Sequence, residues 1–164
     1  ITGLTVRHVG ECFQWSNDTI SQYFHKMTII FSSAPFYTKY VHMPADNEIH
    51  TKIHTNPRFW PFFKDAIGAL DGSHIHAAPS AQQRGMYQNH KGFVSQNCLF
   101  ACNFDLLFTY ALTRWEGSAT DARIYQDAHT KGLYIPDSKY ILGDAGFLTS
   151  RDTCPIPGGP LSFG

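Results

Sequence analysis

The sequence has no excess of charge of either sign and no long apolar run. Its thirteen basic and thirteen acidic side chains cancel, so no overall positive field would hold nucleic acid by charge alone. No apolar run approaches the roughly 18 to 20 residues that a membrane-spanning helix needs. We therefore expect no membrane partner, and any DNA binding must come from a local surface or from another protein.

A regular pattern of cysteines is also missing. Cys12, Cys98, Cys102 and Cys154 are too few and too irregularly spaced for a disulfide scaffold. None of them forms the close Cys-x-x-Cys pair that is typical of a zinc knuckle, so reduced thiols are the simplest expectation. The first residue is Ile1 rather than methionine, and we expect a fragment or a processed product.

What is present suits one folded domain with a helical beginning. The 164 residues, 43% of them hydrophobic, leave room for a core. Residues 4–31 alternate apolar and polar positions at helical spacing around a polar turn at residues 16–18, which predicts two helices. The apolar stripe of the second helix comprises Ile20, Tyr23, Phe24, Met27 and Ile30.

This segment could be a helical hairpin that buries its aromatic face or a helix-turn-helix that reads DNA. The hairpin is favoured because only Arg7, His25 and Lys26 offer positive charge there. Residues 32–64 contain four prolines and several aromatics, which predicts a linker packed against the domain. Residues 1–64 would thus form a helical preface and linker, with Phe59, Trp60, Phe62 and Phe63 in the core.

Between residues 65 and 152 the pattern changes to short apolar runs bounded by turn residues. Runs at residues 66–78, 96–104, 107–115 and 139–143 predict four strands. The turn at residues 103–105 is too short for a parallel crossover, so the second and third strands should form an antiparallel hairpin with the first beside them. Residues 118–128 have helical periodicity, with Ser118 or Thr120 as the cap.

The order strand, strand, strand, helix, strand matches the ribonuclease H-like core, an α/β fold with a mixed sheet. It places Asp71 on the first strand and Asp144 after the fourth. These strands are neighbours in that architecture, so the two carboxylates can converge on a site for Mg²⁺, which prefers oxygen ligands. The alternative is structural, because Asp-Gly is a common turn and Gly-Asp-Ala-Gly could simply end a strand.

Several segments together resemble the Harbinger-type (PIF/Harbinger) DDE transposases and their domesticated nuclease relatives. In chain order they are Phe13–Ser16, Thr19–Ser21, Tyr23–His25, Phe62–His74, Lys91–Gly92, Ser95–Asn97, Trp115–Ser118 with Asp121, and Gly143–Phe147. The resemblance implies a DDE fold that cuts and rejoins DNA with divalent metal ions, Mg²⁺ or Mn²⁺. It further implies a nuclear location and a separate Myb-like DNA-binding partner.

The resemblance also assigns roles to individual acids. Asp71 matches the first catalytic acid, whereas the second could be Asp121 or Asp144, because both lie in family motifs. Topology favours Asp144 as the second metal ligand. Asp121 would fall in the first turn of the helix after the third strand, where a carboxylate interacts favourably with free backbone N–H groups, so its main role is expected to be structural.

Other polar residues near the acids offer weaker alternatives. His74 and His76 lie two apart on one predicted strand and could share a zinc ion, but spacing identifies no further ligands, and packing or substrate orientation is favoured for His74. Arg84, His90 and Lys91 lie between the first two strands, where they could contact phosphate or simply form a solvated loop.

Residues 153–164 depart from the family pattern. The resemblance implies a Tyr- and Arg-rich continuation and then a helix with a catalytic glutamate, whereas this tail is rich in glycine and proline. We expect a C-terminally truncated, incomplete core, and a frameshift or mis-called exon is our hypothesis, testable by sequencing gene and transcript. With two acids the chain alone should cleave weakly or not at all. A non-catalytic DNA- or protein-binding remnant is the alternative function.

Overall fold

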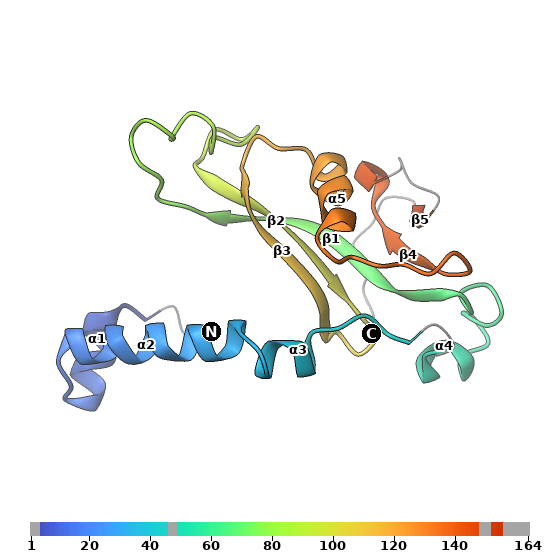
Figure 1. The fold of residues 1–164 in the computed structure, drawn as a ribbon, viewed down its shortest axis with the longest axis horizontal. Coiled ribbons are helices and arrows are strands. Elements are labelled where there is room, and N and C mark those ends of the chain that lie inside the picture. Colours follow the sequence, from blue (N-terminus) through green and yellow to red (C-terminus); the bar gives the residue numbers. More distant parts are fainter. Residues whose placement is uncertain (1–3, 46–48, 148–151, 156–164) are drawn as a thin grey trace. The chain divides into compact units, whose positions relative to one another are not determined.

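The chain was analysed as a computed structural model that describes residues 4–45, 49–147 and 152–155. It divides into two compact units, Ile1–Val41 and His42–Gly164 (Figure 1). In the parts of the chain that are described, no helix is both long and apolar enough to cross a membrane.

The first unit is helical, as predicted. Helix α1 spans Val6–Phe13, α2 spans Asn17–Ser32 and α3 spans Phe36–Tyr40. The polar turn acts as the predicted cap, because the side chain of Ser16 accepts a hydrogen bond from the backbone N–H of Thr19 at the start of α2.

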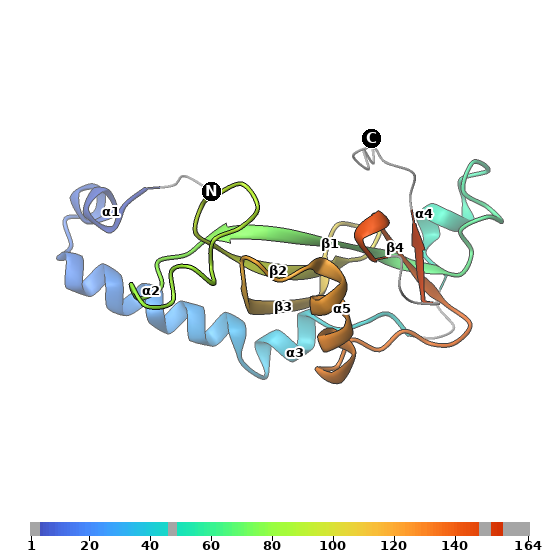
Figure 2. The same ribbon diagram turned by 90° about the horizontal axis from the view of Figure 1, so that it is seen from above.

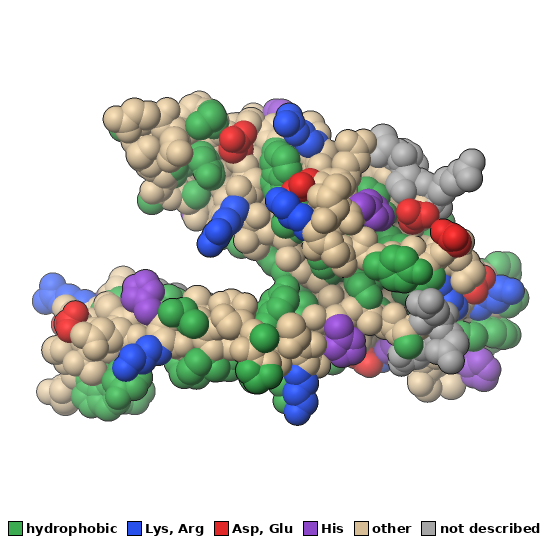
Figure 3. Space-filling model, in the orientation of Figure 1, with side chains coloured by type: hydrophobic (Ala, Val, Ile, Leu, Met, Phe, Trp, Pro, Cys, Tyr) green, Lys and Arg blue, Asp and Glu red, His purple; other side chains and the backbone are tan. Residues whose placement is uncertain are grey.

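The aromatic stripe of α2 is not buried, so the prediction of a buried aromatic face is wrong. Tyr23, Phe24, Met27 and Ile30 are between 44% and 68% exposed, and hydrophobic side chains lie on the surface of these helices (Figure 3). The reason is a shortage of partners: α1 is only eight residues long, and Gly10 is the one residue that it buries.

The second unit begins with an irregular segment that supplies part of the core. Helix α4, Thr51–His54, buries Ile53, and both Phe59 and Phe63 pack against the same buried cluster, as predicted. Phe62 was also expected in the core, but it is 76% exposed. The two partly buried rings are four residues apart, and Phe62 lies outside that spacing.

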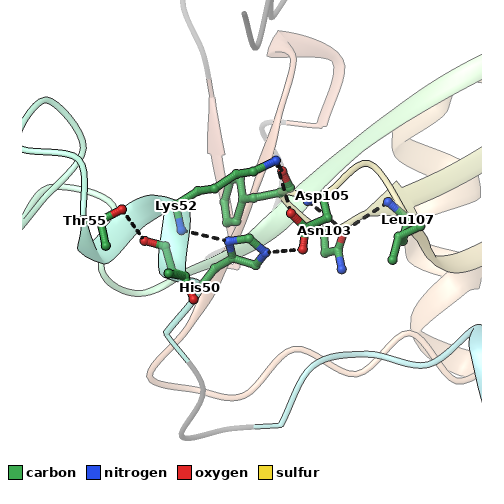
Figure 4. Close-up of polar contacts among 8 residues, drawn as sticks. His50, Lys52, Thr55, Asn103, Asp105 and Leu107 are labelled. Atoms are coloured by element: carbon green, nitrogen blue, oxygen red, sulfur yellow. Dashed lines mark hydrogen bonds and ion pairs between the residues drawn. The ribbon is translucent and has the colours of Figure 1, made fainter.

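Polar contacts fasten α4 to the turn between two strands (Figure 4). Asp105 accepts a hydrogen bond from His50 at 3.0 Å and pairs with Lys52 at 3.1 Å. These bonds hold the pKa of Asp105 below its ordinary value, with Lys52 contributing most and His50 next. Lys52 also donates to the backbone carbonyl of Phe104.

One mixed sheet forms the body of this unit, and its four predicted strands and one helix are confirmed. The elements are β1 Ala66–His76, β2 Ser95–Cys102, β3 Phe108–Glu116, α5 Asp121–Thr130 and β4 Tyr140–Gly143. With a further strand, β5 at Thr153–Pro155, the strand order is β3-β2-β1-β4-β5, in which β1, β2 and β3 are antiparallel and β4 is parallel to β1. This mixed α/β sheet agrees with the ribonuclease H-like fold expected from the sequence.

Two features of the sheet were not anticipated. A fifth strand, β5 at Thr153–Pro155, pairs parallel with β4, so the segment expected to be aberrant begins as part of the sheet, while its residues 156–164 lie outside the described chain. On β3 the register with β2 shifts by one residue, and Arg114 there has a left-handed backbone with φ of 74°.

The two faces of the sheet differ. Helix α5 lies on one face (Figure 2), where Ile124 and Tyr125 pack with Leu70 and Leu99 in the main core. Gly72 pairs with Leu99 across β1 and β2, so position 72 points toward α5. Side chains alternate along a strand, and Asp71 therefore lies on the opposite face.

Candidate metal-binding acidic site

Asp71 and Asp144, which we call the acid pair, are brought together by strand register. In the parallel ladder between β1 and β4, Ala69 pairs with Leu142. Asp71 and Asp144 each lie two positions beyond these partners, so the same offset brings them close together, with Asp144 directly after the end of β4. Both residues keep solvent-exposed surface, which leaves them accessible to a ligand, although neighbouring groups partly shield the carboxyl of Asp71 from water.

Asp144 is oriented by the turn that follows it. The one-turn helix η1, Ala145–Phe147, begins directly after Asp144, and the backbone N–H of Gly146 donates to its Oδ1 at 2.9 Å. Phe147, with no exposed surface, is part of the main core. The buried ring thus anchors the turn that holds the carboxylate.

The electrostatic environment of Asp71 disfavours its charged form. Partial burial is the largest cause that raises its pKa above the ordinary value, and the negative charges of Asp144 and Asp121 raise it further, while a hydrogen bond from the backbone of Gly72 lowers it. The carboxylates of Asp144 and Asp121 therefore each lie close enough to repel that of Asp71. A bound cation would relieve this repulsion.

Asp121 approaches the acid pair from the side of α5. It is the first residue of that helix, as predicted, and its Oδ1 accepts a hydrogen bond of 2.8 Å from the amide of Asn97. A Cβ atom built on Gly72 would lie 2.5 Å from the same Oδ1, and one on Gly146 would lie 3.7 Å from Oδ2. Asp121 therefore contacts the backbone beside the acid pair, although it lies on the other face.

The acid pair fits a divalent metal ion that takes oxygen ligands. Mg²⁺ is commonly bound through one or two carboxylates, with water and substrate phosphate completing its shell, and two adjacent, mutually repelling carboxylates match that donor set. Within residues 4–45, 49–147 and 152–155, no group of three or more His, Cys, Asp or Glu side chains could hold a metal ion. The acid pair would thus rely on water and phosphate for the remaining ligands.

The two histidines considered as zinc ligands are engaged in other contacts. His74 shares a hydrogen bond of 3.0 Å between its Nδ1 and the hydroxyl of the buried Ser95, and the ring of His76 packs on Phe93 with centroids 5.3 Å apart. Among the described residues, neither histidine belongs to a group of three or more side chains that could hold a metal ion. These contacts favour the packing role that the sequence suggested for His74.

The candidate phosphate-contacting residues Arg84, His90 and Lys91 are all exposed in the loop between β1 and β2. The buried Asn89 orders this loop, because its side-chain oxygen accepts from the backbone N–H groups of Lys91 and Phe93. In this part of the described chain none of the three cations forms an ion pair. Phosphate contact by these residues stays a prediction.

A small pocket lies away from the acids. Its cavity of about 150 Å³ is lined by His42, His50, Asn103 and Thr109 among others, and none of the predicted site residues contributes to it. Gly72, Gly146 and Asn97 lie within the motifs that carry the family resemblance, but no separate role was predicted for them. The available signal for Asn97 was an amide two residues before Leu99, on the same face of the strand.

Comparisons with known proteins show the family to which the chain is similar. Residues 70–161 match the model of the DDE superfamily endonuclease family. Three relatives, each named "Putative nuclease HARBI1", come from Rattus norvegicus (28% identical, 68% of this chain and 33% of that protein), Mus musculus (27%, 73% and 36%) and Homo sapiens (29%, 50% and 24%). No solved structure matched the chain.

The similarity to these relatives covers only part of their length. The chain spans about a third of the length of the first curated relatives that it matches. The resemblance to Harbinger-type DDE transposases that the motifs indicated is confirmed. Because the family model matches more than half of the chain and includes both members of the acid pair, this chain belongs to the DDE superfamily endonucleases.

Proposed function

We propose that the chain is the nuclease domain of a transposase-derived protein that acts on DNA phosphodiesters, with Mg²⁺ or Mn²⁺ held by Asp71 and Asp144. The observation that carries this proposal is that Asp71 and Asp144 each lie two residues beyond a paired position, Ala69 and Leu142, of the adjacent parallel strands β1 and β4. Support comes from the family match over the same residues.

Divalent ions bound at such a site activate an attacking oxygen and stabilise the leaving oxygen in phosphodiester cleavage. The chain's own residues prepare the site. Asp144 is fixed by the Gly146 backbone N–H, and the pKa of Asp71 is raised by partial burial and by the charges of Asp144 and Asp121, which a bound cation would offset. Both acids are exposed, so a phosphodiester can reach them.

Activity by this 164-residue chain alone is expected to be weak or absent. The acid pair supplies two carboxylates, whereas the family resemblance implies a third, a glutamate, which we propose is missing from this chain. With two protein ligands the charge that develops in the transition state would be incompletely neutralised.

We also propose that DNA is the substrate, that a Myb-like DNA-binding protein is the partner, and that the protein is located in the nucleus. The balance of thirteen basic and thirteen acidic residues is consistent with a domain that depends on a partner for much of its DNA affinity. Arg84 and Lys91 are the exposed cations of the loop after β1 that could contact phosphate.

The proposal is tested by measuring DNA cleavage in Mg²⁺ and Mn²⁺, with Mn²⁺ binding measured in parallel. Asp71→Ala and Asp144→Ala should each abolish whatever cleavage the chain shows and weaken Mn²⁺ binding. Asp137→Ala, at an exposed acid in the turn before β4, is the control and should change neither. Robust cleavage that survives both substitutions in the acid pair would overturn the assignment.

A non-catalytic remnant that binds DNA or a protein is the second candidate. The observation in its favour is that the described chain contains no group of three or more potential metal-ligating side chains. A folded chain that binds DNA but takes up no Mn²⁺ would support this candidate over the nuclease.

A further inference from the structure

Among the described residues of the sheet, Asn97 is a buried polar side chain, as Ser95 and Thr109 also are. It lies in the middle of the core strand β2 and is 1% exposed, between Ser95 and the buried Leu99 on the same face. Its amide donates to two acceptors, the backbone carbonyl of Ala119 at 3.2 Å and Oδ1 of Asp121 at 2.8 Å. Because both partners are acceptors, they fix the orientation of the amide.

Burial of the amide oxygen of Asn97 costs free energy. The Oδ1 atom of Asn97 is buried and has no hydrogen-bond partner in the described chain, and burying an unsatisfied polar atom opposes folding. Burial of Asn97 therefore costs free energy at its Oδ1, while its N–H groups donate hydrogen bonds at the start of α5. One of these hydrogen bonds fixes the position of the Asp121 carboxylate.

That carboxylate occupies a space left by two glycines, each close to one member of the acid pair. Gly72 directly follows Asp71, and a Cβ on it would lie within 3.0 Å of three atoms of the Asp121 carboxylate. Gly146 holds Asp144 through its backbone N–H. A Cβ atom on Gly146 would lie 3.0 Å from Oδ1 of Asp144 and 3.7 Å from Oδ2 of Asp121. Asp121 is therefore packed between the two backbone segments that carry the acid pair.

We propose that Asn97 is a positioning residue: it holds the Asp121 carboxylate where that group keeps the acid pair in place for a divalent cation. This inference rests on the proposed function. Groups that orient metal ligands without binding the metal commonly change metal affinity by about 10- to 100-fold when they are removed. Asn97 acts here through Asp121 and does not touch the cation.

The test is Mn²⁺ affinity of the full chain, measured by electron paramagnetic resonance, in a double-mutant cycle. Asn97→Ala and Asp121→Ala should each weaken Mn²⁺ binding about tenfold. Because both act through one contact, adding Asn97→Ala to the Asp121→Ala chain should weaken binding no further. The control is Asn89→Ala, which also removes a buried asparagine that orders backbone and should leave Mn²⁺ affinity unchanged while lowering the melting temperature.

The outcomes separate this inference from the proposed function. Wild-type Mn²⁺ affinity in the Asn97→Ala and Asp121→Ala chains, with binding lost in Asp71→Ala, would overturn the role of Asn97 alone. An equal effect of Asn97→Ala with and without Asp121 would also overturn it. Unchanged affinity in Asp71→Ala would overturn the metal site itself, and the inference with it. If circular dichroism shows Asn97→Ala unfolded, Asp121→Ala alone decides, and wild-type affinity in that chain would overturn the inference.

Discussion

The carboxylate of Asp121 lies directly against the backbone of Gly72, at 2.5 Å from where a Cβ atom of residue 72 would be. Gly72 was considered at first as part of an Asp-Gly turn, but it lies inside the continuous strand β1. Its lack of a side chain is therefore explained by a close approach across the sheet face, and not by a turn.

Replacing Gly72 by alanine should destabilise the chain by about 1 to 3 kcal/mol, the usual cost of overpacking. The carboxylate that would have to move is held by Asn97, so it cannot yield freely. Thermal unfolding followed by circular dichroism should show a lower melting temperature, by about 2 to 4 °C per kcal/mol at this chain length. The matched control is Gly85→Ala, because a Cβ there meets nothing within 4 Å. Equal melting temperatures for the two variants would contradict the proposed contact.

Replacing Asp71 by asparagine should stabilise the metal-free chain at neutral pH. The pKa of Asp71 is raised by partial burial and by the charges of Asp144 and Asp121, so its ionised form opposes folding above that pKa. The gain should disappear as the pH falls through the raised pKa, where the wild-type carboxyl is protonated too.

Melting temperatures measured in EDTA from neutral to acidic pH test whether Asp71→Asn stabilises the chain, with Asp137→Asn as the control. The same Asp71→Asn chain should lose the stabilisation that Mn²⁺ gives the wild type, because the substitution removes a ligand. A lower melting temperature in EDTA at neutral pH would show that the charge of Asp71 supports the fold.

Replacing Asp105 by asparagine should destabilise the chain at neutral pH, which is the opposite of the effect expected at Asp71. Hydrogen bonds from Lys52 and His50 lower its pKa, so its ionised form stabilises the fold above the unfolded pKa, and this contribution is lost as the pH falls through the lowered value. Asp105→Asn should therefore melt below the wild type at neutral pH, and the two chains should converge in acid. A melting-temperature difference that is constant with pH would rule out this charge effect.

Trp115 connects β3 to α5 through a polar contact that phenylalanine cannot make. Its indole N–H donates to Asp127 at 3.0 Å, and Arg123 lies 5.5 Å from its ring. Trp115→Phe should lose about 1 kcal/mol of unfolding free energy, the net value of such a bond, in urea denaturation. Trp60→Phe is the comparison, since the ring of Trp60 packs edge-on with His54 and its N–H has no partner among the described residues. A larger loss in Trp60→Phe would contradict this explanation.

Much of the sheet could be predicted because its signals are local. The run at residues 139–143 and the short turn at residues 103–105 are readable from apolar patterning and turn length, and the structure places β4 and the β2-β3 hairpin there. The neighbouring positions of Asp71 and Asp144 followed from topology, since parallel pairing of the first and fourth strands aligns them.

The remaining features depend on contacts that no local pattern encodes. The lack of a side chain at Gly72 is explained by Asp121, 49 residues later in the chain, whose carboxylate lies where a Cβ atom would be. The exposed stripe of α2 has the same spacing as a buried one, so periodicity could not reveal that it lacks a partner. Strand β5 has only three residues, which is too short to produce a recognisable alternation.

The edges of the described sheet bear on how the protein behaves at high concentration. Strand β5 is three residues long and ends in Pro155, which has no backbone N–H with which to pair another strand. The opposite edge strand, β3, is interrupted by the irregular register near Arg114. Short, bulged or proline-containing edges are poor templates for the addition of a strand from another molecule. The fold thus carries, at both sides of its sheet, a built-in resistance to aggregation by edge-to-edge pairing.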